Sequence, residues 1–283
     1  MTRRTVANEI QADGIALHAG APVRMALTPA PPNSGVVFCR SDLGSGTIPA
    51  RYDHVGETRL GTVIQSEAAS VGVIEHLMAA LCGADIDDLL VTVDGPELPI
   101  LDGDALSYLR LIQAAGISES AAPRQAIQVL KPVEAAQGEA RAGLFPSDDR
   151  TFDFEIEFSA PAIGRQSFSW AFSRQGFERE IAPARTFGFV QELEALNKAG
   201  LGRGASLANT LAINGDKVIN ADLMRFPDEF VRHKILDAIG DLALAGAPVL
   251  GRFEGRRSGH ALNNQLLRAL FADPANYARI TME

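Results

Sequence analysis

Three ionisable side chains within an apolar run constrain this chain more than any other feature. His233, Asp237 and Asp241 follow one another at intervals of four in FVRHKILDAIGD, residues 230–241. Residues four apart lie on one face of a helix, so these side chains point together toward what the apolar neighbours mark as the protein interior. Because a buried carboxylate needs a partner or a metal ion, this stripe predicts a functional centre on a buried helix.

A second apolar run, IEHLMAAL at residues 74–81, contains only two ionisable residues, Glu75 and His76. Two histidines and one carboxylate make a zinc site with a free coordination position, and His76 with His233 and Asp237 fits that set. Glu75 is then placed to act as a base beside the metal. The residues alone leave two alternatives open: a hydrogen-bonded His–Asp pair without metal, and a surface glutamate favoured by the helix dipole.

Lys234 and His260 are further candidates for the same site. A cation that follows a ligand such as His233 can stabilise an oxyanion, although a lysine at a domain edge often only extends its charge into solvent. His260 lies in RRSGHALNN at a glycine-marked turn before a helix. Asp241 could orient and charge its imidazole, whereas a lone histidine there would be structural.

Composition excludes several classes of protein. The chain has 283 residues, 46% of them hydrophobic, which allows one large or two medium domains. Its formal charge is −9 and no Lys or Arg stripe is present, which argues against a nucleic-acid binder. Cys39 and Cys82 lie far apart without a CxxC motif, so neither a disulfide nor a thiolate metal site is expected. Without a signal-peptide pattern or an apolar stretch near the ~20 residues of a membrane span, we expect a cytoplasmic protein.

Periodicity and turn signals divide the chain into two halves with the same order of elements. The first half is expected to contain strands at 23–27, 35–39 and 62–65, a helix at 73–82, a strand at 89–93 and a helix at 105–115. The second is expected to contain strands at 127–130, 151–158 and 166–172, a helix at 228–245, a strand at 249–253 and a helix at 261–271. The small, polar segment ISESAAPRQ, from residue 117, is the best linker candidate. We therefore predict an α+β protein of two similar layered domains, 1–122 and 123–283, each a small sheet packed with two helices, with the active site between them.

Several long motifs resemble one enzyme family. They are GIALHAG at 14, IEHLMAALCGADIDD at 74, PELPILDGDA at 96, ARTFGF at 184, RFPDEFVRHKILDAIGDLAL at 225 and SGHALNNQLLRAL at 258. Together they cover nearly the whole chain and are similar to bacterial UDP-3-O-acyl-N-acetylglucosamine deacetylases, zinc amidases that commit the cell to lipid A synthesis.

The resemblance implies roles for specific residues. It implies three zinc ligands, with Fe²⁺ as the alternative metal: His76, His233 and Asp237. It also implies five catalytic residues. Glu75 is the general base. His260, which Asp241 orients, acts with Lys234 and Thr186 to stabilise the tetrahedral intermediate or to protonate the leaving amine.

The resemblance also implies an acylated UDP-sugar substrate and an apolar passage for its acyl chain. An insert in the second domain, near residues 181–220, would form part of the wall, and the glycine-rich segment at 200–213 suits a loop around a lipid chain. Phe187, Glu157 and Phe158 are the expected substrate contacts. We expect a monomer that binds this small molecule. We expect it to bind no nucleic acid and to have no transmembrane segment.

Two positions depart from the family pattern, and other activities compete with the leading one. Asp88 stands where an Asn is usual, and Arg59 in TRLGT where an apolar residue is frequent, which leaves the preferred acyl-chain length open. A zinc amidohydrolase acting on another N-acetyl sugar is the first alternative. An inactive metal-binding homologue is the second, but metal binding alone would not need Glu75, Asp241 or His260.

Overall fold

The computed structural model describes residues 1–44 and 46–283. Its first half is built on a five-stranded sheet with the order β2-β3-β8-β4-β5. These strands are β2 (Ile10–Ile15), β3 (Pro22–Pro29), β4 (Val36–Arg40), β5 (Thr47–Pro49) and β8 (Leu89–Val93). The central strand β8 has the apolar, β-branched sequence LLVTV and pairs antiparallel with β3 and parallel with β4. Helix α1 (Glu75–Gly83) precedes β8 and helix α2 (Leu106–Ala115) follows it.

The second half repeats this topology in a seven-stranded sheet. Its central strand β18 (Val249–Arg256) pairs antiparallel with β12 (Ala140–Phe145) and parallel with β13 (Arg150–Glu157), as β8 does with β3 and β4. Helix α5 (Glu229–Ala243) precedes β18 and helix α6 (His260–Ala272) follows it. The remaining strands of the sheet are β10 (Gln125–Val129), β11 (Val133–Gln137), β14 (Arg165–Ala171) and β19 (Tyr277–Thr281). The expected α+β class with two similar layered units is confirmed.

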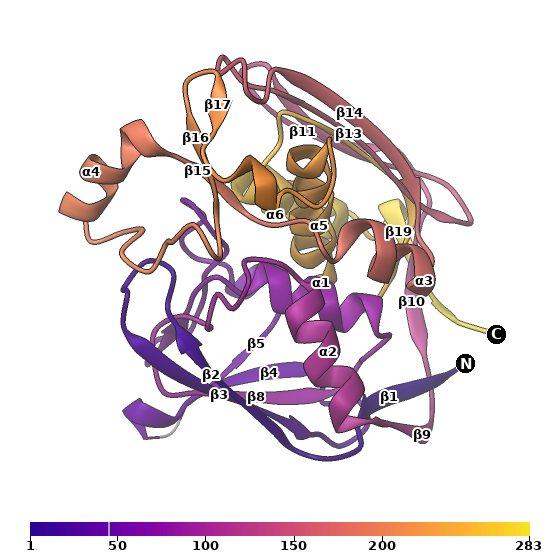
Figure 1. The fold of residues 1–283 in the computed structure, drawn as a ribbon. Helices are drawn as coiled ribbons and strands as arrows, with labels where there is room; N and C mark the ends of the chain where they lie inside the picture. Colours follow the sequence, from indigo (N-terminus) through magenta and orange to yellow (C-terminus); the bar gives the residue numbers. More distant parts are fainter. Residues whose placement is uncertain (45) are drawn as a thin grey trace.

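The helices lie between the two sheets, and α1 packs directly against α5 (Figure 1). Every residue of α1 except Cys82 is buried, as expected for a helix that is apolar around its whole circumference. The two backbones touch at Gly240, where an added Cβ would lie 2.0 Å from the carbonyl oxygen of Glu75. Glycine is therefore required at this crossing, and it brings the start of α1 beside the last turn of α5.

The helices expected from the sequence are present, with small shifts at their ends. The helix expected at 73–82 begins at Glu75 because Val73 has φ = +57°, a left-handed conformation that a helix cannot contain. The helix expected at 228–245 ends at Ala243, and Gly246, with φ = +81°, turns the chain toward β18.

The linker candidate that starts at residue 117 is a paired strand. Residues Ile117–Pro123 form strand β9, which pairs antiparallel with β1 (Thr2–Val6). None of the β9 side chains is fully buried, so this strand lacks the alternation of apolar and polar residues by which strands are found in a sequence. The strand expected at 62–65 is shorter than expected: it is β6 (Ile64–Gln65), paired with β7 (Ser70–Val71).

Each half carries an addition just before its histidine-bearing helix. In the first half it is the β6–β7 pair. In the second it contains β15 (Phe187–Phe189), α4 (Val190–Lys198), β16 (Leu211–Asn214) and β17 (Lys217–Val218). Helix α4 projects from the body of the molecule in Figure 1 and buries none of its residues. A short helix α3 (Arg174–Gly176) and a π-helical turn (Phe177–Ile181) lead into this region. Within the described ranges, no helix is long and apolar enough to cross a membrane.

Candidate metal centre and active site

Three candidate metal ligands converge where α1 crosses α5. Nε2 of His233 lies 3.4 Å, and Nε2 of His76 lies 3.7 Å, from Oδ1 of Asp237. All three residues are buried, and the two imidazole rings meet edge to face with centroids 5.0 Å apart. The first half of the molecule supplies His76 and the second supplies His233 and Asp237, so the cluster forms only when the halves pack together.

The spacing of these atoms fits a single tetrahedral metal ion. Bonds of about 2.0–2.1 Å at tetrahedral angles place neighbouring ligand atoms about 3.4 Å apart. The distances to Oδ1 of Asp237 are 3.4 and 3.7 Å, and one ligand atom from each of the three residues lies within 4.8 Å of the others. The arrangement needs only small adjustments to hold an ion.

The protonation states of the cluster also suit a metal. Burial lowers the pKa of His76 to about 3 and lowers the pKa of His233, so both imidazoles are neutral near pH 7. Burial opposes the ionisation of Asp237, but His233 and Lys234 hold the pKa of its carboxyl below the usual value. Neutral imidazoles and an ionised carboxylate are the forms that bind a metal ion.

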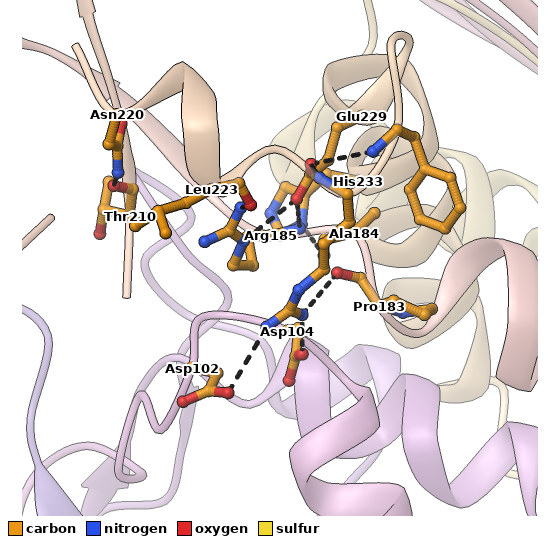
Figure 2. A network of polar contacts seen from close by, with 12 residues as sticks. Asp102, Asp104, Pro183, Ala184, Arg185, Thr210, Asn220, Leu223, Glu229 and His233 are labelled. Atoms are coloured by element: carbon orange, nitrogen blue, oxygen red, sulfur yellow. Dashed lines mark hydrogen bonds and ion pairs between the residues drawn. The ribbon is translucent and has the colours of Figure 1, made fainter. Parts of the chain in front are cut away.

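The loop before β15 orients His233. The Nδ1–H group of His233 donates to the carbonyl oxygen of Ala184 at 3.1 Å. A carbonyl can only accept, so the imidazole proton is on Nδ1 and the lone pair of Nε2 is free on the side of Asp237. Figure 2 shows this loop beside the first turn of α5, where Arg185 and Glu229 contact each other.

Glu75 lies next to the cluster as the first residue of α1. Burial of its carboxyl raises the pKa of Glu75 to about 7. The backbone N–H of Thr62 donates to Oε2 at 3.0 Å, and Oε1 lies 3.9 Å from Nε2 of His260. A carboxyl with a pKa near neutrality can accept and release a proton at working pH.

His260, at the start of α6, faces Glu75. Its Nδ1–H group donates to Oδ2 of Asp241 at 2.9 Å. Burial lowers the pKa of His260, but Asp241 and Glu75 more than compensate and raise it to about 9. Asp241 is itself fixed by the hydroxyl of Thr62 at 2.6 Å and the amide of Asn263 at 2.9 Å. The carboxyl of Glu75 and the charged imidazole of His260 thus face each other, with 3.9 Å between Oε1 and Nε2.

Lys234 and Thr186 line the cavity beside the cluster. Nζ of Lys234 donates to Oδ2 of Asp237 at 2.6 Å. Burial lowers the pKa of Lys234, but Asp237 more than compensates, so the pKa is above its usual value and the ammonium group stays charged. The three residues at intervals of four on α5 thus serve two groups. His233 and Asp237 belong to the cluster with His76, whereas Asp241 contacts His260 on α6.

A cavity of about 490 Å³ opens at this cluster. Its apolar wall is formed by residues from both halves and from the addition that contains α4: Leu17, Leu60, Val73, Phe158, Phe187, Phe189, Leu196 and Leu262. The rings of Phe158 and Phe187 lie 5.6 Å apart. Glu157 is not among the described residues that line the cavity. Its carboxylate pairs with Arg257, which does line the cavity.

The two departures from the family pattern lie away from the cluster. Asp88 is buried and forms a salt bridge of 2.6 Å with Arg3, which gives its charge a structural partner. Arg59 lines a separate cavity of about 180 Å³, whose wall shares His18 and Val73 with the larger one.

Three functional candidates were not found from the sequence. Thr62 contacts both Glu75 and Asp241, but it stands in an unremarkable TRLGT segment, and its partners are 13 and 179 residues away. Asn263 and Arg257 flank His260 in the sequence, so their nearness to the site could have been inferred from position alone.

Two buried imidazoles and a carboxylate at ligand distances, beside an acid–base pair in a cavity, define a site of the metal-dependent hydrolase class. Comparison with known families gives the particular member of that class. The family model described as UDP-3-O-acyl N-acetylglycosamine deacetylase matches residues 3–272, and the chain belongs to this family.

Proteins named UDP-3-O-acyl-N-acetylglucosamine deacetylase are similar to this chain over nearly its whole length. One from Myxococcus xanthus is 45% identical over 276 residues, which cover 97% of this chain and 88% of the relative. One from Anaeromyxobacter sp. is 47% identical over 272 residues, 96% and 89% of the two chains. One from Phenylobacterium zucineum is 48% identical over 264 residues, 92% and 90% of the two chains.

Proposed function

We propose that this protein hydrolyses the 2-acetamido group of UDP-3-O-acyl-N-acetylglucosamine and releases acetate and UDP-3-O-acyl-glucosamine, in lipid A biosynthesis. One observation carries this proposal: three ligand atoms, a carboxyl with a pKa near neutrality and a charged histidine meet at an apolar-walled cavity in a member of this family. The names of the relatives support the same substrate.

We assign the metal site to His76, His233 and Asp237, and zinc as its ion, with Fe²⁺ as the alternative. Two imidazoles and one carboxylate leave a coordination position open, as catalytic zinc sites do. When bound, the ion would supply Lewis-acid polarisation of the amide carbonyl and of water.

The side chains around the cluster account for the proton transfers. Glu75 takes a proton from water as the water oxygen bonds to the acetamido carbonyl carbon. Lys234 and Thr186 stabilise the negative charge that develops on the carbonyl oxygen. His260, kept charged by Asp241, protonates the amide nitrogen as the C–N bond breaks. The products are the free amine and acetic acid, which loses the remaining water proton to solvent and becomes acetate. Return of the proton on Glu75 to His260 restores both groups for the next turnover.

The cavity offers separate surfaces to the two ends of the substrate. The apolar wall that includes Phe187, Phe189 and Leu196 suits an acyl chain. Phe158 offers a ring face for uracil, and Arg257 offers a cation for the diphosphate, with Glu157 contributing only through its ion pair with Arg257. We further propose that the enzyme acts as a monomer in the cytoplasm.

A deacetylation assay tests the proposal. Purified protein is incubated with UDP-3-O-acyl-N-acetylglucosamine or with UDP-N-acetylglucosamine, and the loss of the acetyl group is followed by mass spectrometry with and without a chelator. We expect deacetylation of the acylated substrate that stops with chelator and returns with zinc. No acetate release from zinc-loaded protein refutes the proposal, and equal activity on the sugar without an acyl chain would favour another N-acetyl sugar as substrate.

A further inference from the structure

Glu229 is a fully buried carboxylate that the reaction above does not use. It is the first residue of α5, one helical turn before His233, and 0% of its surface is exposed. Oε1 accepts from the backbone N–H of Arg185 at 3.0 Å and from its Nε–H at 3.2 Å. Oε2 accepts from the backbone N–H groups of Arg225 and Phe226. A carboxylate that accepts four N–H groups draws two loops onto the start of the helix that carries two ligands.

One of these hydrogen bonds leads directly to the metal ligand. The N–H of Arg185 and the carbonyl of Ala184 belong to the same peptide group, which is rigid and planar. Its N–H end donates to Glu229, and its carbonyl end accepts from Nδ1–H of His233 at 3.1 Å. Figure 2 shows Glu229, Arg185, Ala184 and His233 close together at the start of α5. A carboxylate on the N–H end also polarises the carbonyl and makes it a better acceptor.

The loop on either side of this peptide group has other anchors. The carbonyl of Pro183 accepts from Nη1 of Arg225 at 2.7 Å, and the N–H of Thr186 donates to the carbonyl of Gly103 at 2.8 Å. Nη1 of Arg225 also pairs with Asp104 of the first half. Loss of the Glu229 contact should therefore leave the loop in place and free mainly the orientation of the peptide group between its anchors.

We propose that Glu229 is a positioning residue for the metal ligand His233. Through the peptide group between Ala184 and Arg185, it fixes the orientation and tautomer of the imidazole so that Nε2 faces Asp237. Carboxylates that hold a ligand histidine directly are a common feature of metal sites, and here a peptide group stands between the two. The inference rests on the metal site proposed above.

The variant Glu229→Gln tests this role. Both oxygens of Glu229 accept hydrogen bonds from N–H groups. In either orientation of a glutamine side chain, its NH₂ group would face N–H donors, so the four hydrogen bonds cannot all be kept. The matched control is Asp228→Asn, which removes a negative charge from the adjacent residue at the same helix start. Asp228 pairs with Arg232 at 2.6 Å and not with the loop at 183–186, so this control measures the loss of a charge and of an ion pair at the helix start without loss of the loop contact.

Zinc-loaded protein is titrated with a competing chelator to obtain the zinc dissociation constant. We expect Glu229→Gln to weaken zinc binding about 10- to 100-fold, the usual effect of removing such a support, while Asp228→Asn changes it less than about threefold. At saturating zinc, kcat of the glutamine variant should return to near the wild-type value, because Glu229 acts only through His233.

Each outcome decides a separate point. Failure of the wild type to bind zinc refutes the proposed metal site and with it this inference. Zinc binding of Glu229→Gln equal to wild type refutes the role of Glu229 while leaving the metal site intact, and so does an equal loss in both variants. If the glutamine variant does not fold, Glu229→Asp, whose carboxylate is one methylene too short to reach both loops, decides the question by the same titration.

Discussion

Replacement of Gly240 by alanine should separate the two halves of the metal site. A Cβ at this position would lie 2.0 Å from the carbonyl oxygen of Glu75, whereas a carbon–oxygen contact needs about 3.3 Å, so α1 must recede by about 1.3 Å. His76 follows Glu75 and moves with it, which increases the 3.7 Å between its Nε2 and Oδ1 of Asp237 to about 5 Å. One ion cannot bridge ligand atoms more than about 4.2 Å apart, twice a bond of about 2.1 Å.

This variant should stay folded while its zinc affinity falls. Overpacking costs about 1–3 kcal/mol, and alanine recovers about 1 kcal/mol of helix propensity, so a net loss of up to about 2 kcal/mol is expected. In a chain of this size that lowers Tm by roughly 4–8 °C. Zinc affinity, measured by competition with a chelating indicator, should fall at least about tenfold. Ala243→Gly, at the end of the same helix, is the control that lowers helix stability without adding atoms. Wild-type zinc affinity in Gly240→Ala would refute the link between helix spacing and ligand spacing.

Further predictions concern the base, the acid and the acyl wall. Glu75→Ala should keep its zinc by elemental analysis but lose roughly 10²–10⁴-fold in kcat, and near-normal turnover would exclude Glu75 as the base. The rate should rise with pH as Glu75 loses its proton, near its pKa of about 7, and fall as His260 loses its proton, near its pKa of about 9. A bound cation lowers both pKa values and so moves both limbs of the profile toward lower pH. His260→Gln should abolish the alkaline limb, and an unchanged limb would exclude His260 as the acid. Catalytic efficiency should rise with acyl-chain length up to a limit, because each buried methylene contributes about 0.8 kcal/mol. Leu196→Phe should lower this limit and Arg59→Leu should leave it unchanged, because Leu196 lines the large cavity and Arg59 lines the smaller one. A flat chain-length series in the wild type would argue against the apolar passage.

The central helices and the residues that they bring together could be predicted from the sequence. Ionisable residues in an apolar run must be accounted for by a specific partner, and the spacing of four between His233 and Asp237 defines one helix face without knowledge of the fold. The repeated order of elements likewise predicted the two sheets, because the same supersecondary plan appears twice. These features depend on local patterns, which a sequence contains in full.

The parts that could not be predicted depend on distant contacts or on exposed surfaces. Strand β9 buries none of its residues fully, and no apolar periodicity marks it. Helix α4 is exposed as well, although its apolar residues at 190, 193 and 196 have helical spacing. Thr62 is defined by contacts with α1 and α5 that only the folded chain brings together. The strand at residues 117–123 is hidden for the same reason: small polar residues are typical of linkers, but an exposed strand can have that composition as well.

The division of the ligands between the two halves has a thermodynamic consequence. Since neither half holds three ligands, an ion can bind to all of them only when the halves are associated. The free energy of ion binding therefore stabilises the association of the halves. By linkage, an ion at 1,000 times its dissociation constant would add about 4 kcal/mol to the stability of the folded chain, a large fraction of what a typical domain possesses. Metal availability would then govern what fraction of the protein is folded, as well as whether its chemistry can proceed.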